Sequence, residues 1–475
     1  MEEWKSRDRE KVETQTFKIS ANLARGKQSI PIHAQYASKY SIFVRFLNHD
    51  RFIDGAEFNK LFIKNNGEEF ELGPCRFISE PNIDGYDGRL IFVYDVYDLR
   101  SLFSDNRVLS LQNAFIDLPL VLAHKKKVKQ SFKHYTANLS YDLNVYKSLF
   151  DDLDAEYIQE PMDIQASVQE AIINTEGKNF LCFLDKKLHE LEHLVAGFNK
   201  EEHERHGFYF RKLLWSIIMC SPFMKRTNLK PRGYPGDSVM MRMLYRNEHE
   251  GETTFAKLMH KHPMEHPAAR AVRNRRKLVT QKLIETQNKH SVPSGEKLKV
   301  LSVACGPAFE LQDILMSPED CDKYHFTLLD QDRQALYEAA TLIDQIEKKL
   351  GTKIYVDYLD ESVRTMLASS RLKDKWGVFD YIYSMGLFDY LTPPVASAVI
   401  GKLYKILKPG GTMLIGNFHV SNPSRYYMEY WLDWVLYYRT EEEFTDLLGN
   451  AGSTEATVFF EDSGSQMFLQ VEKRQ

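Results

Sequence analysis

Cysteine is scarce in this chain of 475 residues, and it is not arranged for disulfides or metal binding. The five cysteines are odd in number and scattered, without the paired spacing of a zinc site. Long apolar runs are missing too, since no segment approaches the roughly 18 residues that a membrane-spanning helix needs. The segment Met1–Glu10 is rich in charge and predicts no secretory signal. From these absences we expect a protein of the cytoplasm.

A strong excess of charge of one sign is also missing. The chain has 62 Lys and Arg against 66 Asp and Glu, so it has no general attraction for nucleic acid or anionic lipid. The loop expected after a strand at 379–384 reads Ser384-Met-Gly-Leu and lacks the Asn/Asp-Pro-Pro-Tyr pattern of enzymes that flip bases. We therefore expect neither a nucleic-acid partner nor a membrane span.

The chain is too long for one core, and its patterns divide it into three predicted regions. The first, residues 1–138, carries alternating β-like runs between Asn-Gly, Asp-Gly and Gly-Pro turns. These runs fall at 40–47, 60–64, 74–79 and 89–94. The pattern predicts a small antiparallel barrel or sandwich.

The second region, residues 139–290, is almost wholly helical in pattern. Four of its histidines, His189, His193, His203 and His206, lie close in sequence. No Glu-x-x-His or cysteine pattern organises them, so we interpret them as surface or packing residues and predict no metal site.

The third region, residues 291–475, alternates strands with helices and predicts an α/β fold. Its most informative stretch is an apolar strand that breaks at Ala304-Cys305-Gly306-Pro307 and restarts as a helix. Such a turn presents backbone N–H groups to a ligand. The next predicted strand ends in Asp330, at the spacing where a carboxylate reaches ribose hydroxyls in nucleotide-binding folds. Together they indicate a cofactor built on adenosine.

The composition of the turn selects among such cofactors. A dinucleotide site requires several glycines, because its pyrophosphate approaches the backbone closely. Here only Gly306 is glycine, with Ala304 and Ala308 at the neighbouring small positions. S-adenosylmethionine carries no phosphate, so small residues suffice, and we predict that cofactor.

The strand–helix alternation, which closes with a hairpin at Asp462-Ser-Gly-Ser465, resembles the Rossmann-like class I S-adenosylmethionine-dependent methyltransferase fold. The resemblance covers 291–475 and implies a seven-stranded sheet whose last strand is antiparallel. It departs from the family at Ser302, where an acid is usual, and Glu310 is the expected substitute. The cofactor-binding residues that the resemblance implies are Ala304, Cys305, Gly306, Pro307, Glu310, Asp330, Gln331, Leu359, Asp360, Ser384, Met385 and Phe388.

The helical region contains a loop, Lys230-Pro-Arg-Gly-Tyr-Pro-Gly-Asp237, that cannot be helical. It presents Tyr234 and Asp237. A basic segment follows, with Arg270, Arg273 and Lys277 on one helical face. We expect this loop and the basic helix to cap the cofactor cleft, with 139–290 as a cap and substrate domain.

The order of these segments resembles one bacterial methyltransferase group more closely than the fold alone does. The Gly-Tyr-Pro-Gly-Asp loop, Gly251-Glu-Thr-Thr, Arg273-Asn-Arg-Arg and Ala304-Cys-Gly-Pro occur in the order found in the extracellular factor 3-hydroxypalmitic acid methyl ester biosynthesis proteins. This resemblance spans about 140–475. It implies methyl transfer to the carboxylate of a hydroxy fatty acid or an acyl derivative.

Such a reaction requires no general base, because a carboxylate is already ionised near neutral pH. It requires a cation to orient the carboxylate, for which Arg273, His419 and Arg439 are candidates beside Tyr234 and Asp237. An acyl chain also needs apolar walls. Seven aromatic residues can supply them or pack as core, namely Tyr426, Tyr427, Tyr430, Trp431, Trp434, Tyr437 and Tyr438.

The β-rich region at 1–138 resembles the PilZ domain, a bacterial receptor for cyclic di-GMP. That family reads its ligand with an Arg-x-x-x-Arg arm and an Asp/Asn-x-Ser-x-x-Gly strand. Here Ser38 is present, but Tyr36 and Ser41 stand at the acid and glycine positions, and no arginine pair precedes them. The resemblance implies a relative without the ligand, used for docking a protein partner or for homodimerisation.

Two other functions stay open at this point. One is a methyltransferase acting on an amine or hydroxyl of a small metabolite. The other is a signalling protein without catalysis, which senses S-adenosylmethionine or a lipid; the missing acid at Ser302 favours it.

Overall fold

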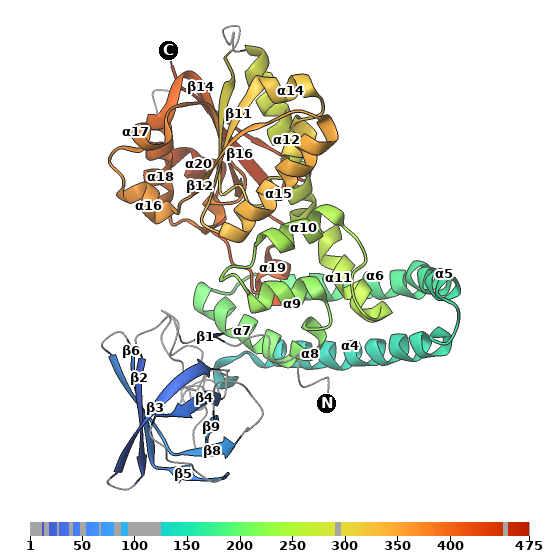
Figure 1. Ribbon diagram of the computed structural model, residues 1–475. Coiled ribbons are helices and arrows are strands. Elements are labelled where there is room, and N and C mark those ends of the chain that lie inside the picture. Colours follow the sequence, from blue (N-terminus) through green and yellow to red (C-terminus); the bar gives the residue numbers. More distant parts are fainter. Residues whose placement is uncertain are drawn as a thin grey trace. The chain divides into compact units, whose positions relative to one another are not determined.

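The computed structural model describes residues 12–13, 19–25, 28–37, 41–47, 54–65, 68–79, 87–93, 125–289, 296–449 and 455–474. The chain divides into two compact units, Met1–Lys127 and Val128–Gln475 (Figure 1). The predicted helical region and the predicted α/β region thus belong to one unit. Among the described residues, no helix is both long and apolar enough to cross a bilayer.

The first unit is an antiparallel β structure in its described part. Its sheet follows the order β5-β8-β9-β4-β3-β2-β6-β7, with β1 paired to β3. The strands are β1 (Val12–Glu13), β2 (Ile19–Arg25), β3 (Gln28–Ala37), β4 (Ser41–Phe46), β5 (Glu57–Phe58), β6 (Lys60–Asn65), β7 (Glu68–Leu72), β8 (Cys75–Ser79) and β9 (Gly88–Phe92). Four of them, β4, β6, β8 and β9, lie on the predicted runs. Ser38, the residue shared with the PilZ pattern, lies outside the described residues.

The second unit begins with helices, as its sequence pattern predicts. They are α4 (Gln130–Tyr157), α5 (Met162–Ile172), a π-helical turn η4 (Ile173–Gly177), α6 (Lys178–Val195), α7 (Lys200–Leu213), α8 (Trp215–Ile218), α9 (Pro222–Leu229), α10 (Ser238–Arg246), α11 (Thr254–Glu265) and α12 (Pro267–Lys289). Several begin at a side chain that caps the first free N–H groups, such as Ser221, Asp237 and Thr253. Their apolar faces share one core with the aromatic helix α19 (Arg425–Trp431).

A seven-stranded sheet follows, in the order β12-β11-β10-β13-β14-β16-β15. The strands are β10 (Leu298–Val303), β11 (Tyr324–Asp330), β12 (Tyr355–Asp360), β13 (Phe379–Ser384), β14 (Leu407–Phe418), β15 (Glu455–Phe460) and β16 (Gln466–Glu472). The pairs from β12 to β14 are parallel, whereas β16 is antiparallel to both neighbours. This confirms the predicted seven-stranded sheet with an antiparallel last strand.

Helices cover both faces of this sheet (Figure 1). On one face lie α12 and α15 (Arg333–Leu350), and on the other α16 (Val363–Ala368), α17 (Leu372–Trp376), α18 (Pro393–Ile406) and α20 (Glu441–Asp446). Three short helices complete the region, α13 (Leu311–Ile314), α14 (Pro318–Lys323) and the 3₁₀ turn η5 (Phe388–Tyr390).

Helix α12 joins the two halves of the second unit. Its first half, including Val272, packs in the helical core, and its second half, including Val279 and Leu283, packs under the sheet. The strand order reverses between β10 and β13. In open α/β sheets a crevice forms at such a reversal, beyond the carboxyl ends of the strands.

Candidate functional site

A cleft of about 370 Å³ lies at this reversal. The sheet side supplies the turn after β10, the end of β11 and the segments that follow β12 and β13. The helical side supplies the loop before α10, together with residues of α10 and α12. The cleft is therefore shared between the α/β region and the helical region, as expected for a capped site.

The floor of the cleft is the turn that follows β10. Ala304, Gly306 and Ala308 adopt positive φ angles of 54°, 55° and 51°. Holding a residue other than glycine in this left-handed region costs roughly 1–2 kcal/mol, so two alanines there store strain. Strain of this kind persists where surrounding contacts impose it. It marks the predicted turn as a shaped element rather than a simple connection.

Asp330, at the end of β11, supplies such a contact. Its Oδ2 accepts a hydrogen bond from the Gly306 backbone N–H at 2.8 Å, and its Oδ1 accepts one from Asp332 N at 2.9 Å. The side chain is buried, and this burial raises the pKa of its carboxyl. Asp330 thus fixes the turn while it lines the cleft.

Glu310 is a buried carboxylate in the wall of the cleft. The Tyr383 hydroxyl donates a 2.6 Å hydrogen bond to its Oε1. Burial raises the pKa of Glu310, although this hydrogen bond and the charges of Arg276 and Arg275 oppose the rise. Ser302 is buried in β10 and is absent from the cleft lining.

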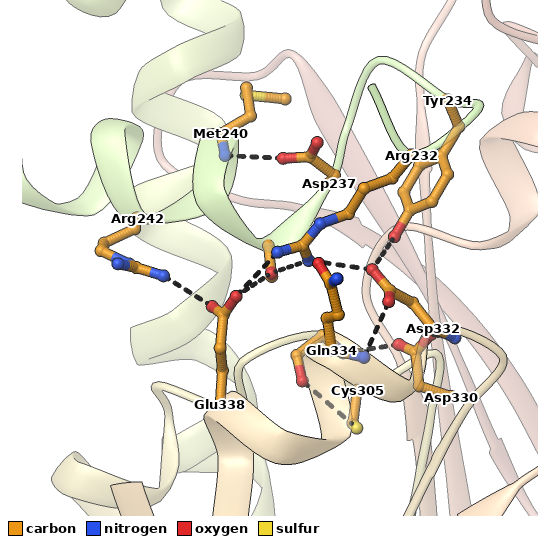
Figure 2. A network of polar contacts seen from close by, with 12 residues as sticks. Arg232, Tyr234, Asp237, Met240, Arg242, Cys305, Asp330, Asp332, Gln334 and Glu338 are labelled. Atoms are coloured by element: carbon orange, nitrogen blue, oxygen red, sulfur yellow. Dashed lines mark hydrogen bonds and ion pairs between the residues drawn. The ribbon is translucent and has the colours of Figure 1, made fainter. Parts of the chain in front are cut away.

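The loop before α10 is held to the first turns of α15 by ion pairs, as Figure 2 shows. The Arg232 guanidinium lies 2.9 Å from Asp332 Oδ2 and 3.0 Å from Glu338 Oε1. Arg242 of α10 reaches the second oxygen of Glu338 at 2.7 Å. The Tyr234 hydroxyl donates to Asp332 Oδ2 at 3.3 Å, and burial raises its pKa. These contacts place Tyr234 in the cleft wall.

Arg275 of α12 is a cleft residue that the sequence analysis did not select. It is 7% exposed, and its Nη1 donates to the Met385 carbonyl at 3.2 Å. Its Nη2 contacts the Met241 sulfur at 3.4 Å. Its Nε is buried and finds no hydrogen-bond partner within the described part of the chain. The Tyr245 side chain is a further hydrogen-bond partner of this guanidinium. Because a guanidinium has five N–H donors, Arg275 still has donors left for an anion in the cleft.

Asp389 is the carboxylate that faces this arginine from η5. It lines the cleft and accepts a hydrogen bond from Phe418 N at 2.7 Å. Burial raises the pKa of Asp389 to about 6, against the opposing charges of Arg275 and Arg439. The cleft therefore contains a carboxyl group that changes charge not far below neutral pH.

Four residues predicted as catalytic lie outside the cleft lining, and each has other contacts. Asp237 caps α10 through Met240 N and pairs with Arg226 at 2.7 Å. Arg273 donates to the carbonyls of Leu244 and Met264.

His419 lies beyond the end of β14, where its Nε2 is 3.0 Å from Glu441 Oε2. Arg439 is buried and donates to the Phe388 and Leu391 carbonyls and to the Asn417 side chain. Of the predicted catalytic set, the structure thus brings only Tyr234 into the cleft.

The predicted cofactor residues divide into two groups. Those that line the cleft are Ala304, Cys305, Gly306, Pro307, Glu310, Asp330, Gln331 and Met385. Those that do not are Leu359, Asp360, Ser384 and Phe388. Beyond β12 the lining residues are instead Glu361, Ser362, Val363 and Met366, and beyond β13 they include Gly386 and Leu387. Leu359 and Asp360 thus precede the lining residues that follow β12, and Ser384 precedes those that follow β13. Phe388 lies between Leu387 and Asp389, which both line the cleft.

The aromatic residues between Tyr426 and Tyr438 are mainly part of the hydrophobic core. Tyr427, Tyr430 and Trp431 are buried in the helical core, whereas Tyr437 is 44% exposed. Trp434 lines the cleft and donates from Nε1 to the Tyr390 hydroxyl at 2.8 Å.

A second, smaller cavity of about 20 Å³ adjoins the cleft at an apolar wall. The two spaces share Val272, Phe418 and Trp434. The other lining residues of this cavity are mainly apolar and include Phe223, Leu244, Met428 and Leu432.

Comparison with family models and with curated proteins found no match to this chain. Solved structures do match over large parts of their own length. One is a possible exported protein from Bordetella parapertussis, with 17% identity and a TM-score of 0.43 over 62% of this chain and 96% of that one. Another is magnesium protoporphyrin IX methyltransferase from Synechocystis PCC 6803 with bound SAH, with 12% identity and a TM-score of 0.35 over 50% and 95%.

A third is the N-methyltransferase NodS from Bradyrhizobium japonicum WM9, with 13% identity and a TM-score of 0.28 over 42% and 96%. All three TM-scores lie below 0.5.

Proposed function

We propose that this protein is an S-adenosylmethionine-dependent methyltransferase that methylates the carboxyl group of a fatty acid or acyl derivative. The observation that carries the proposal is the cleft at the strand reversal. It combines a glycine-poor, strained turn held by Asp330 with a buried, weakly partnered arginine, Arg275. The first feature suits an adenosine cofactor without phosphate, and the second suits an anionic acceptor.

The residues around the turn fit the cofactor by their chemistry. A carboxylate can accept about four hydrogen bonds, and Tyr383 supplies one to Glu310. Glu310 therefore keeps acceptor capacity for a primary ammonium group, in place of the acid missing at Ser302. Asp330 likewise keeps lone pairs for ribose hydroxyls beyond its two backbone contacts. When bound, the cofactor supplies a methyl group on a positively charged sulfur.

Arg275 is the cation that orients the acceptor carboxylate in this proposal, whereas the sequence analysis suggested Arg273, His419 or Arg439. Those three side chains are engaged outside the cleft, whereas Arg275 is in it. Its guanidinium would hold the acceptor carboxylate by charge-assisted hydrogen bonds. Since the carboxylate is already ionised, the protein needs only to orient it and to exclude water.

The apolar wall of Val272, Phe418 and Trp434 favours an acceptor with an acyl chain. This wall leads from the cleft toward the second cavity, whose lining is also mainly apolar. Apolar pockets with a few placed polar groups are typical of sites for such ligands. The free acid of a chain lying along this wall would present its carboxylate to Arg275.

The loop containing Arg232 and Tyr234 acts as the cap in this proposal. Its ion pairs to α15 hold Tyr234 and Gly236 against the cleft. A Cβ added to Gly236 would lie 2.8 Å from the Tyr390 hydroxyl and 3.3 Å from the Trp434 ring, so a larger residue here would displace one of these side chains. Close packing here excludes water from the acceptor.

The test has a binding arm and a product arm. Calorimetric titration with S-adenosylhomocysteine should show binding, and labelled S-adenosylmethionine should transfer its methyl group to saturated or 3-hydroxy fatty acids. The product should be a methyl ester, which mild base cleaves, whereas an N-methyl group would survive. Binding without transfer to acid, amine or hydroxyl acceptors would favour a sensor instead.

Two variants test whether Arg275 binds the acceptor carboxylate. Arg275→Gln should abolish transfer to the fatty acid while S-adenosylhomocysteine still binds. Lys277→Gln, on the exposed face of the same helix, is the matched control and should retain activity. Full activity of Arg275→Gln would contradict the proposed role of that arginine.

A further inference from the structure

A cluster of three metal-ligating side chains lies outside the cleft, in the helical part of the second unit. It comprises Asp185 of α6, His262 of α11 and His266, which separates α11 from α12. One ligand atom of each residue lies within 4.8 Å of the others. The sequence analysis predicted no metal site, and these residues were not among the histidines it considered.

The distances within the cluster are those of a coordination shell. Asp185 Oδ1 lies 3.0 Å from His262 Nε2 and 3.6 Å from His266 Nε2, and the two Nε2 atoms are 3.4 Å apart. Ligand atoms at about 2.0–2.1 Å from a tetrahedral zinc ion lie roughly 3.3 Å from one another. All three edges are close to that value.

A hydrogen-bond network explains this arrangement less well. One N–H from His262 to Asp185 accounts for the 3.0 Å contact. The 3.6 Å distance from His266 Nε2 to the same oxygen is too long for a hydrogen bond. The contact between the two Nε2 atoms is a long hydrogen bond at 3.4 Å. His262 Nε2 cannot donate to Asp185 and accept from His266 at once, because a ring nitrogen is either a donor or an acceptor.

Contacts behind the ligands support the same interpretation. His262 Nδ1 lies 2.6 Å from the Tyr427 hydroxyl, which orients the ring so that Nε2 faces the cluster. The His266 ring packs edge-on against Tyr427, with centroids 4.7 Å apart.

We propose that Asp185, His262 and His266 bind a zinc ion, with a water molecule as the fourth ligand. Imidazole and carboxylate donors in tetrahedral arrangement suit zinc. His262 is buried, whereas the Asp185 side chain is 61% exposed, so the fourth position opens to solvent on the side of Asp185. This site does not depend on the proposed methyltransferase activity.

The site has a structural consequence. It ties α6 to the junction of α11 and α12, and through Tyr427 to the aromatic helix α19. Helix α12 begins one residue after His266 and carries Val272 and Arg275 into the cleft. Zinc would therefore stabilise the helical region from which the cleft receives these residues.

The experiment uses the full-length chain after treatment with a chelator. Zinc is titrated in competition with a chromophoric chelator, and thermal unfolding is followed with and without zinc. We expect one zinc ion per chain and a higher Tm with zinc. Cobalt(II) should give the visible absorption bands of a four-coordinate ion.

Two variants remove ligands, and a third is the control. Asp185→Asn and His266→Gln should each weaken zinc binding at least about tenfold, since even contacts behind metal ligands are worth that much. Asp185 is exposed, so its variant should keep its circular dichroism spectrum. His193→Gln changes an exposed histidine on the same helix, which faces His189 at 2.9 Å, and should bind zinc like the original chain.

Either of two results would overturn the proposal. The first is no stoichiometric zinc binding by the original chain. The second is zinc affinity that is unchanged in Asp185→Asn and His266→Gln, including the case in which His193→Gln alone loses it, because the zinc would then occupy the His189–His193 pair.

Discussion

The Asp330 carboxylate accepts a 2.8 Å hydrogen bond from the backbone N–H of Gly306, between the ends of two neighbouring parallel strands. This contact joins the end of β11 to the turn after β10. The turn holds Ala304 and Ala308 at positive φ, so it needs outside support to keep its shape. The carboxylate predicted to bind the cofactor also builds the surface on which the cofactor would lie.

Asp330→Ala should therefore lose cofactor binding through two effects. The ligand loses an acceptor, and the buried N–H of Gly306 loses its partner, which costs about 1–3 kcal/mol by itself. We expect S-adenosylhomocysteine affinity to fall by at least about tenfold in calorimetric titration. Asp344→Ala on α15 removes only a surface pair with Lys348 and should bind normally. Equal affinity in the two variants would show that Asp330 has no such role.

Among the residues of the loop before α10, Arg232 should have the largest effect on acceptor binding when it is removed. Its guanidinium contacts both Asp332 and Glu338 and is 15% exposed, so Arg232→Ala should release the loop from α15. We expect the KM for the acceptor to rise about tenfold or more, consistent with about 1.5–3 kcal/mol for hydrogen bonds between charged groups.

The control for the cap is Arg242→Ala. Arg242 contacts Glu338 alone and is 37% exposed, so its loss should change the KM little. Limited proteolysis near residue 233 should increase in the Arg232 variant only. Matching kinetics and proteolysis in the two variants would argue against a loop held by Arg232.

The sheet could be predicted from the sequence because buried parallel strands are near-continuous apolar runs between turns. Val300, Leu301 and Val303 of β10 are such residues, and all are buried. The turn itself was predictable because Gly306 and Pro307 cannot continue a strand. The positive φ angles of Ala304 and Ala308 were not, since alanine rarely adopts them.

The residue that would bind the acceptor was harder to predict, because the sequence does not show which face of a helix turns toward the cleft. Arg273 and Arg275 are two residues apart on α12 and so point to different faces. The sequence shows both as basic residues, but only tertiary packing decides which one turns into the cleft. A buried structural arginine such as Arg439 has the same appearance in sequence as an arginine that binds a ligand.

The contacts of Arg439 indicate that it stabilises the folded protein. Arg439→Ala would leave the carbonyls of Phe388 and Leu391 and the Asn417 side chain without this donor. Because each buried acceptor without a partner costs about 1–3 kcal/mol, urea unfolding should show a loss of about 3 kcal/mol or more. His419→Ala, which removes contacts with Glu441, Ser421 and the Phe460 ring, should cost less than Arg439→Ala. An Arg439 variant with normal stability but no turnover would instead assign Arg439 to the chemistry.

Asp389 should make stability depend on pH. Its pKa is raised to about 6 in the folded protein by burial, whereas an unfolded aspartate has a pKa of about 3.9. The folded state thus binds the proton more tightly, and the ionised carboxylate lowers stability above pH 6. This penalty, roughly 3 kcal/mol from the difference in pKa, fades as the pH falls through 6 and is gone below about pH 4.

Asp389→Asn removes this titration, so comparison with the original chain isolates it. The free energy of unfolding of the variant minus that of the original chain should increase by roughly 3 kcal/mol from pH 4 to pH 8. Urea unfolding at several pH values measures this difference, and Asp344→Asn on the surface serves as a control that should show no such trend. A difference that stays constant with pH would mean that Asp389 is not held in a buried, desolvated environment. A decrease with rising pH would mean that Arg275 and Arg439 outweigh the burial.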